Sequence, residues 1–123
     1  MDYLNISAKY FVIFGLANKK SVAAAIGSTL LEQGGQVIFA VRSRQRQETA
    51  RKLFPQCPVF ICDVEEEQQI VRVSEEIGQW LKEHQVDSLA GIVHSIAFAN
   101  YSEGMKPFHE TGRDDFLQAV NIS

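Results

Sequence analysis

A glycine and a serine six positions apart follow the first apolar run of the chain. Residues 10–14 read YFVIF, Gly15 comes next, and Ser21 opens a segment of small apolar residues after a short polar loop. A strand, a tight turn and a helix N-terminus in this order suit a phosphate, because helix N-termini present unpaired N–H groups and a partial positive charge. Gly15 allows the backbone to turn sharply and a ligand to come close. An ordinary turn with a serine N-cap stays open, since the later glycines of G-x-G-x-x-G are absent.

Basic residues follow the second apolar run, which spans residues 36–41. Arg42-Ser43-Arg44 comes first, Arg46 follows, and no acidic residue occurs before Glu48. At this place a dinucleotide-binding fold senses the adenosine ribose, where an acid bonds the 2′-hydroxyl and an arginine accommodates a 2′-phosphate. Arg42 and its neighbours therefore favour a 2′-phosphate, with the solvated first turn of a helix as the alternative.

Polar residues also follow the third and fourth apolar runs. Asp63 stands where a carboxylate can meet an adenine amino group, and with Glu66 it also fits a D-x-x-E capping box. Both roles can coexist. After the fourth run, small residues from Ser95 to Ala97 are placed to pass beside the nicotinamide half of a cofactor. We interpret His94 as a core histidine and assign it no catalytic role.

Alternating strand and helix patterns position these residues. Parallel strands joined by short links and helices give right-handed βαβ units, so we expect an α/β fold with a Rossmann-like, doubly wound parallel sheet in strand order 3-2-1-4. The ligand site is then expected between the first and fourth strands. The predicted strands are 9–14, 36–41, 59–62 and 88–94, and the predicted helices are 21–33, 44–54, 65–84 and one that opens at 111–114.

Length and composition allow one domain, residues 1–123. The last helix is still running at Ser123 with no strand to follow it, so we interpret the chain as the truncated, amino-terminal half of a doubly wound domain. With a net charge of −3 we expect no nucleic-acid footprint, and we expect neither a membrane helix nor a signal peptide, because no apolar run is long enough and the N-terminus lacks a basic start and an apolar core. Cys57 and Cys62 are expected to be free thiols in a reducing cytoplasm rather than a disulfide or a metal site.

Three strings carry a resemblance to a known family. These are GLANKKSVA at 15–23, CDV at 62–64 and HSIAFAN at 94–100. Together they resemble the enoyl-acyl-carrier-protein reductases of bacterial type II fatty-acid synthesis, a divergent branch of the short-chain dehydrogenase/reductases. The helix TGRDDFLQAVNIS at 111–123 is also similar to the segment that leads into that family's fourth helix.

The resemblance implies a cofactor site and a reaction. The cofactor is NADPH or NADH, with NADPH favoured by Arg42. A hydride passes from the nicotinamide C4 to the β-carbon of a trans-2-enoyl thioester carried by acyl carrier protein, and the enolate is stabilised and protonated. A homo-oligomer is implied for the full-length enzyme. The implied contacts are Gly15, Ser21 and Val22 at the pyrophosphate, Arg42 at the adenosine ribose, Asp63 and Val64 at the adenine, and Ser95, Ile96 and Ala97 along the nicotinamide.

The family's catalytic tyrosine and lysine have no counterpart in this sequence. None of Tyr3, Tyr10 and Tyr101 is followed by a lysine in a Tyr-x6-Lys arrangement. We therefore predict no catalytic residue in this chain and no activity for the chain alone. Two alternatives stay open: a carbonyl-reducing short-chain dehydrogenase, and a non-catalytic Rossmann module that binds a nucleotide.

Overall fold

The fold is described from a computed structural model, which covers residues 4–97, 104 and 107–123. Strands and helices alternate along these residues, as the apolar pattern predicts. The strands are β1 (Tyr10–Phe14), β2 (Gln36–Val41), β3 (Val59–Ile61) and β4 (Gly91–His94). The helices are α1 (Val22–Glu32), α2 (Arg44–Leu53), α3 (Glu67–Glu83) and α4 (Arg113–Ile122), with a short 3-10 turn, η1 (Phe108–Glu110), before α4.

The strands form a parallel sheet in the order β3-β2-β1-β4, which confirms the predicted topology. β1 lies between β2 and β4, with Val12 opposite Ile38 on one side and Ile92 on the other. The direction in which successive strands are added to the sheet reverses at β1. Folds of this kind bind ligands in the crevice at that point, beyond the carboxyl ends of β1 and β4.

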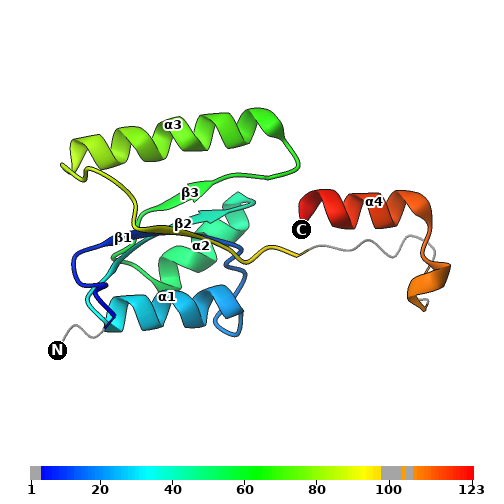
Figure 1. Ribbon diagram of the computed structural model, residues 1–123, viewed down its shortest axis with the longest axis horizontal. Helices are drawn as coiled ribbons and strands as arrows, with labels where there is room; N and C mark the ends of the chain where they lie inside the picture. Colours follow the sequence, from blue (N-terminus) through cyan, green and yellow to red (C-terminus); the bar gives the residue numbers. More distant parts are fainter. Residues whose placement is uncertain (1–3, 98–103, 105–106) are drawn as a thin grey trace.

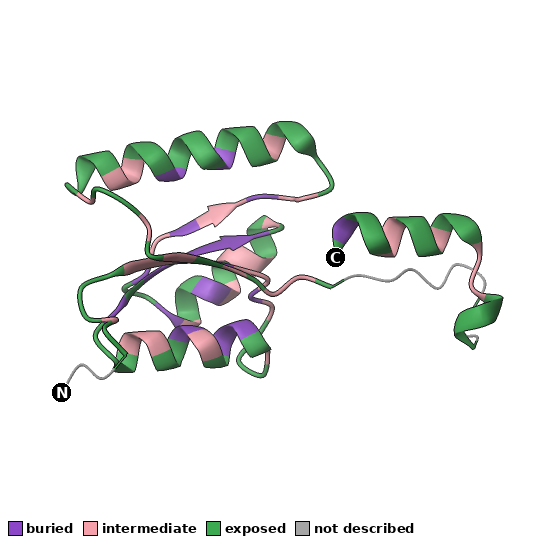
Figure 2. Ribbon diagram, viewed as in Figure 1, coloured by how far each residue is buried: buried purple, intermediate pink, exposed green. Residues whose placement is uncertain are grey.

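Helices cover both faces of the sheet (Figure 1). Ile13 and Phe39 pack in the core under α1 and α2, whereas Val12 and Ile38 pack in the core under α3. Neighbouring residues of a strand point to opposite faces, so the same strands supply both cores. β2 is buried continuously over 37–41 (Figure 2), the pattern of a strand covered on both faces.

Local sequence sets the ends of α1. The Ser21 hydroxyl oxygen accepts a hydrogen bond from the Ala24 N–H at 3.3 Å and caps the first turn. Gly34, at φ 86°, reverses the chain after the last turn, a conformation that glycine adopts readily. Gly27 lies against the ring of Phe39, where an added Cβ would stand 2.8 Å from Cζ. Glycine thus brings α1 close to the sheet.

Two predicted boundaries are wrong by two or three residues. α3 begins at Glu67, because residues 63–66 form a turn in which the Glu66 N–H donates to the Asp63 carbonyl oxygen at 3.0 Å. β4 begins at Gly91 rather than Ser88. The preceding residues turn the chain out of α3, with Gln85 at φ 59° and the Val86 N–H donating to Leu81 O.

α4 lies beyond the carboxyl edge of the sheet (Figure 1). Gln118 Nε2 donates to Glu65 Oε1 at 3.1 Å, and Ile122 is buried at the end of the helix. Phe116, Leu117 and Val120 are exposed. Across the described ranges, no helix combines the length and the apolarity needed to cross a membrane.

Candidate functional site

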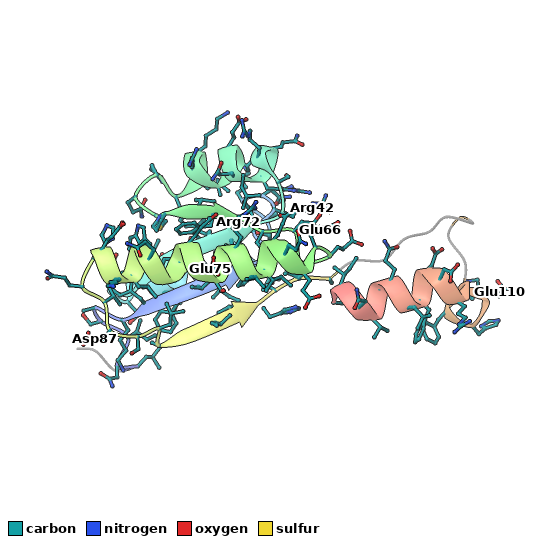
Figure 3. All side chains as sticks on the ribbon, turned by 90° about the horizontal axis from the view of Figure 1, so that it is seen from above. Arg42, Glu66, Arg72, Glu75, Asp87 and Glu110 are labelled. Atoms are coloured by element: carbon teal, nitrogen blue, oxygen red, sulfur yellow. The ribbon has the colours of Figure 1, made fainter. Side chains whose placement is uncertain are left out.

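A cavity of about 210 Å³ lies where the carboxyl ends of the strands meet. Figure 3 shows Arg42 and Glu66 at this end of the sheet, with Asp87 at the opposite end. The walls come from five segments of the chain. They are Phe14–Ala17 after β1; Ala40, Val41, Arg42 and Arg46 of β2 and α2; Cys62–Glu65 after β3; Ser95–Ala97 after β4; and Ile122 at the end of α4.

Gly15 and Ser95 bring the loops after β1 and β4 into direct contact. Gly15 has φ 104°, and a Cβ on it would lie 1.9 Å from the Ser95 carbonyl oxygen. The Ser95 N–H donates to Phe14 O at 3.1 Å, which continues the pairing of the two strands into their loops. Only glycine fits here, because both the backbone conformation and the space exclude a side chain. Glycine at position 15 therefore lets the loops after β1 and β4 touch at the edge of the cavity where the strand order reverses.

Ser21 and Val22 do not line the cavity. The Ser21 hydroxyl donates to Asn18 O in the preceding loop at 2.8 Å and caps α1 by accepting from the Ala24 N–H, so both bonds lie within the protein. Val22, the first residue of α1, is 66% exposed. The first turn of α1 carries no acidic residue, which leaves the positive end of its dipole uncompensated by a carboxylate. A pyrophosphate contact for Ser21 and Val22 stays a prediction.

The arginines after β2 differ in position. Arg42 is exposed and lines the cavity, while Arg44 is exposed and does not. Arg46 is half-buried and lines the cavity as well, although the sequence offered no reason to separate it from Arg44. Its Nη1 donates to the Ala17 carbonyl oxygen at 3.2 Å. α2 has no acidic residue in its first turn, so this wall of the cavity is positive.

Asp63 and Val64 line the cavity from the β3 side. Asp63 is not a helix cap, so the predicted capping box is wrong: Glu66 holds the N-cap position, and its side chain makes no capping hydrogen bond. Instead, Asp63 Oδ1 accepts from the Glu65 N–H at 3.1 Å, and the Asp63 N–H donates to Gln69 Oε1 at 2.9 Å. These bonds hold the carboxylate in a turn at the cavity wall, and its contact with adenine stays a prediction.

The segment after β4 contributes Ser95, Ile96 and Ala97 to the cavity, next to Gly15. Phe98, Ala99 and Asn100 of the HSIAFAN string lie outside the described residues, as do Tyr3 and Tyr101. The interpretation of His94 as a core histidine is wrong. β4 is at the end of the sheet order, and His94 is exposed there.

Two further apolar residues line the cavity. Ile122 has no recognisable signal in the sequence and reaches the cavity only because α4 returns to it, whereas Cys62 has no signal besides its place in the CDV string. Burial, and then the neighbouring Asp63 carboxylate, raise the pKa of the Cys62 thiol, so it lines the cavity as a neutral group. Cys57 is buried under α2, away from the cavity, and both thiols are free. Within the described ranges no His, Cys, Asp and Glu cluster could hold a metal ion.

Comparison with known proteins identifies the family. A family model described as enoyl-(acyl carrier protein) reductase matches residues 15–123. The chain belongs to this family. It is 33% identical to the enoyl-acyl-carrier-protein reductase FabI of Staphylococcus aureus, named as NADPH-dependent, over 98% of this chain and 47% of that protein. It is 32% identical to the FabI of Bacillus cereus, named as NADH-dependent, over 96% of this chain and 46% of that protein.

Solved structures of enoyl-acyl-carrier-protein reductases share the fold. The Bacillus cereus enzyme in complex with NADP+ and indole naphthyridinone has a TM-score of 0.84 at 31% identity, over 95% of this chain and 46% of that one. The Anaplasma phagocytophilum enzyme in complex with NAD has a TM-score of 0.79 at 26% identity, over 95% of this chain and 44% of that one. The chain thus spans about half the length of the relatives it matches. The family match disfavours the carbonyl-reducing alternative.

Proposed function

We propose that this chain forms the cofactor-binding part of an enoyl-acyl-carrier-protein reductase that uses NADPH or NADH. The observation that supports this most is the cavity itself, which gathers Gly15, Arg42, Asp63 and Ser95 at the carboxyl ends of the strands. These residues come from four separate stretches of sequence. A dinucleotide has a phosphate, a ribose and two rings to recognise, and each stretch offers a group suited to one of them.

The residues present fit such a cofactor. Gly15, Leu16 and Ala17 line the cavity, and the loop they begin leads to the N-terminus of α1, whose first turn has no acidic residue and suits a pyrophosphate. Arg42 offers a guanidinium to a 2′-phosphate, and the wall it belongs to lacks an acidic first turn in α2. We therefore favour NADPH over NADH. The cavity is smaller than the about 300–1,000 Å³ of typical ligand pockets, so we expect it to hold part of the dinucleotide.

The bound nicotinamide would supply a hydride to the β-carbon of a trans-2-enoyl thioester on acyl carrier protein. The residues of this chain are proposed to bind the cofactor and to orient its nicotinamide ring. Ser95, Ile96 and Ala97 would form a wall of small or apolar groups beside the nicotinamide, and Val64 and Asp63 would lie at the adenine. No Tyr-x6-Lys pair occurs in the sequence, so we propose that this chain alone does not reduce the substrate. Assembly into a homo-oligomer and a cytoplasmic location stay predictions.

Two measurements test the proposal. The first is titration of the 123-residue chain with NADPH and with NADH, followed by the fluorescence of the reduced nicotinamide. The second is a turnover assay with a crotonyl thioester and either cofactor. We expect saturable binding, tighter for NADPH, without turnover.

Each other outcome contradicts a different part of the proposal. An absence of saturable binding for both cofactors would contradict the cofactor site. Turnover close to that of a family enzyme would contradict the inactivity of this chain, while supporting the reaction. Binding that is equally tight for both cofactors would contradict the preference assigned to Arg42.

A further inference from the structure

We propose that Arg46 is a positioning residue that holds the loop of residues 15–20 against α2, so that the loop is set for a pyrophosphate before a ligand arrives. The consequence for cofactor binding rests on the function proposed above. Arg46 is distinct from Arg42, since its guanidinium already bonds to the protein backbone. Its Nη1 donates to Ala17 O at 3.2 Å, across 29 positions of sequence.

The loop is otherwise bonded to itself. The Lys20 N–H donates to Asn18 Oδ1 at 2.8 Å, and the Ser21 N–H and hydroxyl both donate to Asn18 O, at 3.1 and 2.8 Å. Packing of Leu16 in the core that also holds Val41 and Ala50 already places the start of the loop against β2 and α2, and these bonds shape the rest of the loop, to which Arg46 adds one polar bond. The Arg46 bond to Ala17 joins it to a second element, two residues after the contact of Gly15 with Ser95.

The backbone at Arg46 is held in place by hydrogen bonds and packing of α2. Its backbone N–H donates to the Ser43 Oγ at the start of α2, at 3.3 Å. One residue later, Gln47 Nε2 donates to Val59 O in β3 at 2.8 Å. Ala50 is fully buried in the core under α2. The backbone of Arg46 is thus fixed by a packed helix, so only the side-chain torsions of Arg46 have to be ordered when its guanidinium bonds to Ala17 O.

This role predicts a pattern of cofactor binding that differs from that of Arg42. The pyrophosphate is common to NADPH and NADH, so loss of the Arg46 bond should weaken both to the same extent. We expect Arg46→Met to raise the Kd about tenfold for each, as for the loss of one hydrogen bond from a charged donor. The Kd of 2′-AMP, which has the 2′-phosphate but no pyrophosphate, should stay within about twofold.

Arg44→Met is the matched control, because Arg44 is on the same turn of α2 and does not line the cavity. It removes the same charge and should leave all three Kd values unchanged. Arg46→Lys keeps a donor on a flexible stem and should recover part of the lost affinity. A free energy of unfolding equal to that of Arg44→Met, measured in urea, excludes general destabilisation as the cause.

Hydrogen exchange tests the positioning without any cofactor. The Lys20 and Ser21 amides are hydrogen-bonded within the loop, so their exchange rates report how often the loop opens. We expect about tenfold faster exchange at these amides in Arg46→Met and no change in Arg44→Met. Unchanged exchange would overturn the proposal, and so would a loss of affinity confined to NADPH, which would make Arg46 a 2′-phosphate ligand. Faster exchange in a chain that binds neither cofactor would uphold the positioning role and refute the proposed function instead.

Discussion

Replacement of Gly15 by alanine is the sharpest test of the contact between Gly15 and Ser95 at the edge of the cavity. The new Cβ would lie 1.9 Å from Ser95 O and 2.5 Å from Ser95 C, whereas ordinary contact begins at 3.4 Å. Both atoms belong to the backbone, so no side chain can rotate away. The loops after β1 and β4 must therefore separate, and the φ of 104° is unfavourable for alanine in addition.

Two terms set the size of the effect. Backbone strain at a positive φ costs about 1–3 kcal/mol for a residue other than glycine. Forcing extra volume into a tightly packed place costs about 1–3 kcal/mol more. We expect Gly15→Ala to lower the free energy of unfolding by about 2–6 kcal/mol, a large part of the stability of a small domain. The Kd values of NADPH and NADH should both rise by about tenfold or more, because the displaced loop carries the side of the cavity proposed for the pyrophosphate.

Two other glycines separate these terms. Gly104 has φ 91°, and no atom of the described residues lies within 4 Å of its Cβ position, so Gly104→Ala should show the strain without the collision. Gly78 is on the exposed side of α3, also with no described atom within 4 Å. Gly78→Ala should stabilise the chain by about 0.5–1 kcal/mol through helix propensity.

Urea unfolding followed by circular dichroism gives the three free energies, and fluorescence titration gives the affinities. The reasoning would be refuted if Gly15→Ala unfolded no more easily than Gly104→Ala and bound both cofactors like the parent chain. If Gly15→Ala were destabilised more than Gly104→Ala but bound both cofactors like the parent chain, the contact between Gly15 and Ser95 would support the fold without shaping the site.

Two further predictions concern charge and pH. Arg42→Ala should raise the Kd of NADPH about tenfold and that of NADH at most about twofold, because Arg42 lines the cavity and the first turn of the neighbouring helix α2 has no acidic residue. Equal losses of affinity for the two cofactors in parallel titrations would contradict a 2′-phosphate contact. Burial raises the pKa of the Cys57 thiol from 9.0 to about 11, so its proton stabilises the folded state fully below pH 9, and this contribution is lost as the pH rises through about 11. Urea unfolding between pH 8 and 11 should therefore show a fall of about 2 kcal/mol that is absent in Cys57→Ala, and an equally steep fall in the variant would assign it to another group.

The order and pairing of the elements could be predicted because they depend on local patterns. The continuous apolar run of β2 indicates a strand covered on both faces, and Ser21 and Gly34 mark the ends of α1. The start of α3 could not be placed, since Asp63 and Glu66 fit a capping box as well as they fit the turn that forms. Gly27 gave no signal either, because its role depends on the ring of Phe39 in another element.

The site could be predicted where it follows the ends of strands. Gly15, Arg42, Asp63 and Ser95 each come just after an apolar run, and parallel strands carry their carboxyl ends to the same edge. Arg46 and Ile122 could not be found in this way, since helix orientation alone brings them to the cavity. His94 was misjudged because an apolar pattern does not say which strand lies at the end of the sheet.

The pairing of β1 with β4 has a consequence for how the protein folds. Phe11 pairs with Gly91 although most of the chain separates them in sequence. This pairing therefore closes a far longer loop than the pairing of β1 with β2. Long closures are entropically disfavoured and slow folding, so we expect the β4 strand to dock after the β1–α1–β2 unit has collapsed. The cavity would then be absent from early compact states. A dinucleotide would therefore leave the rate of the earlier folding steps unchanged and would slow only the undocking of β4.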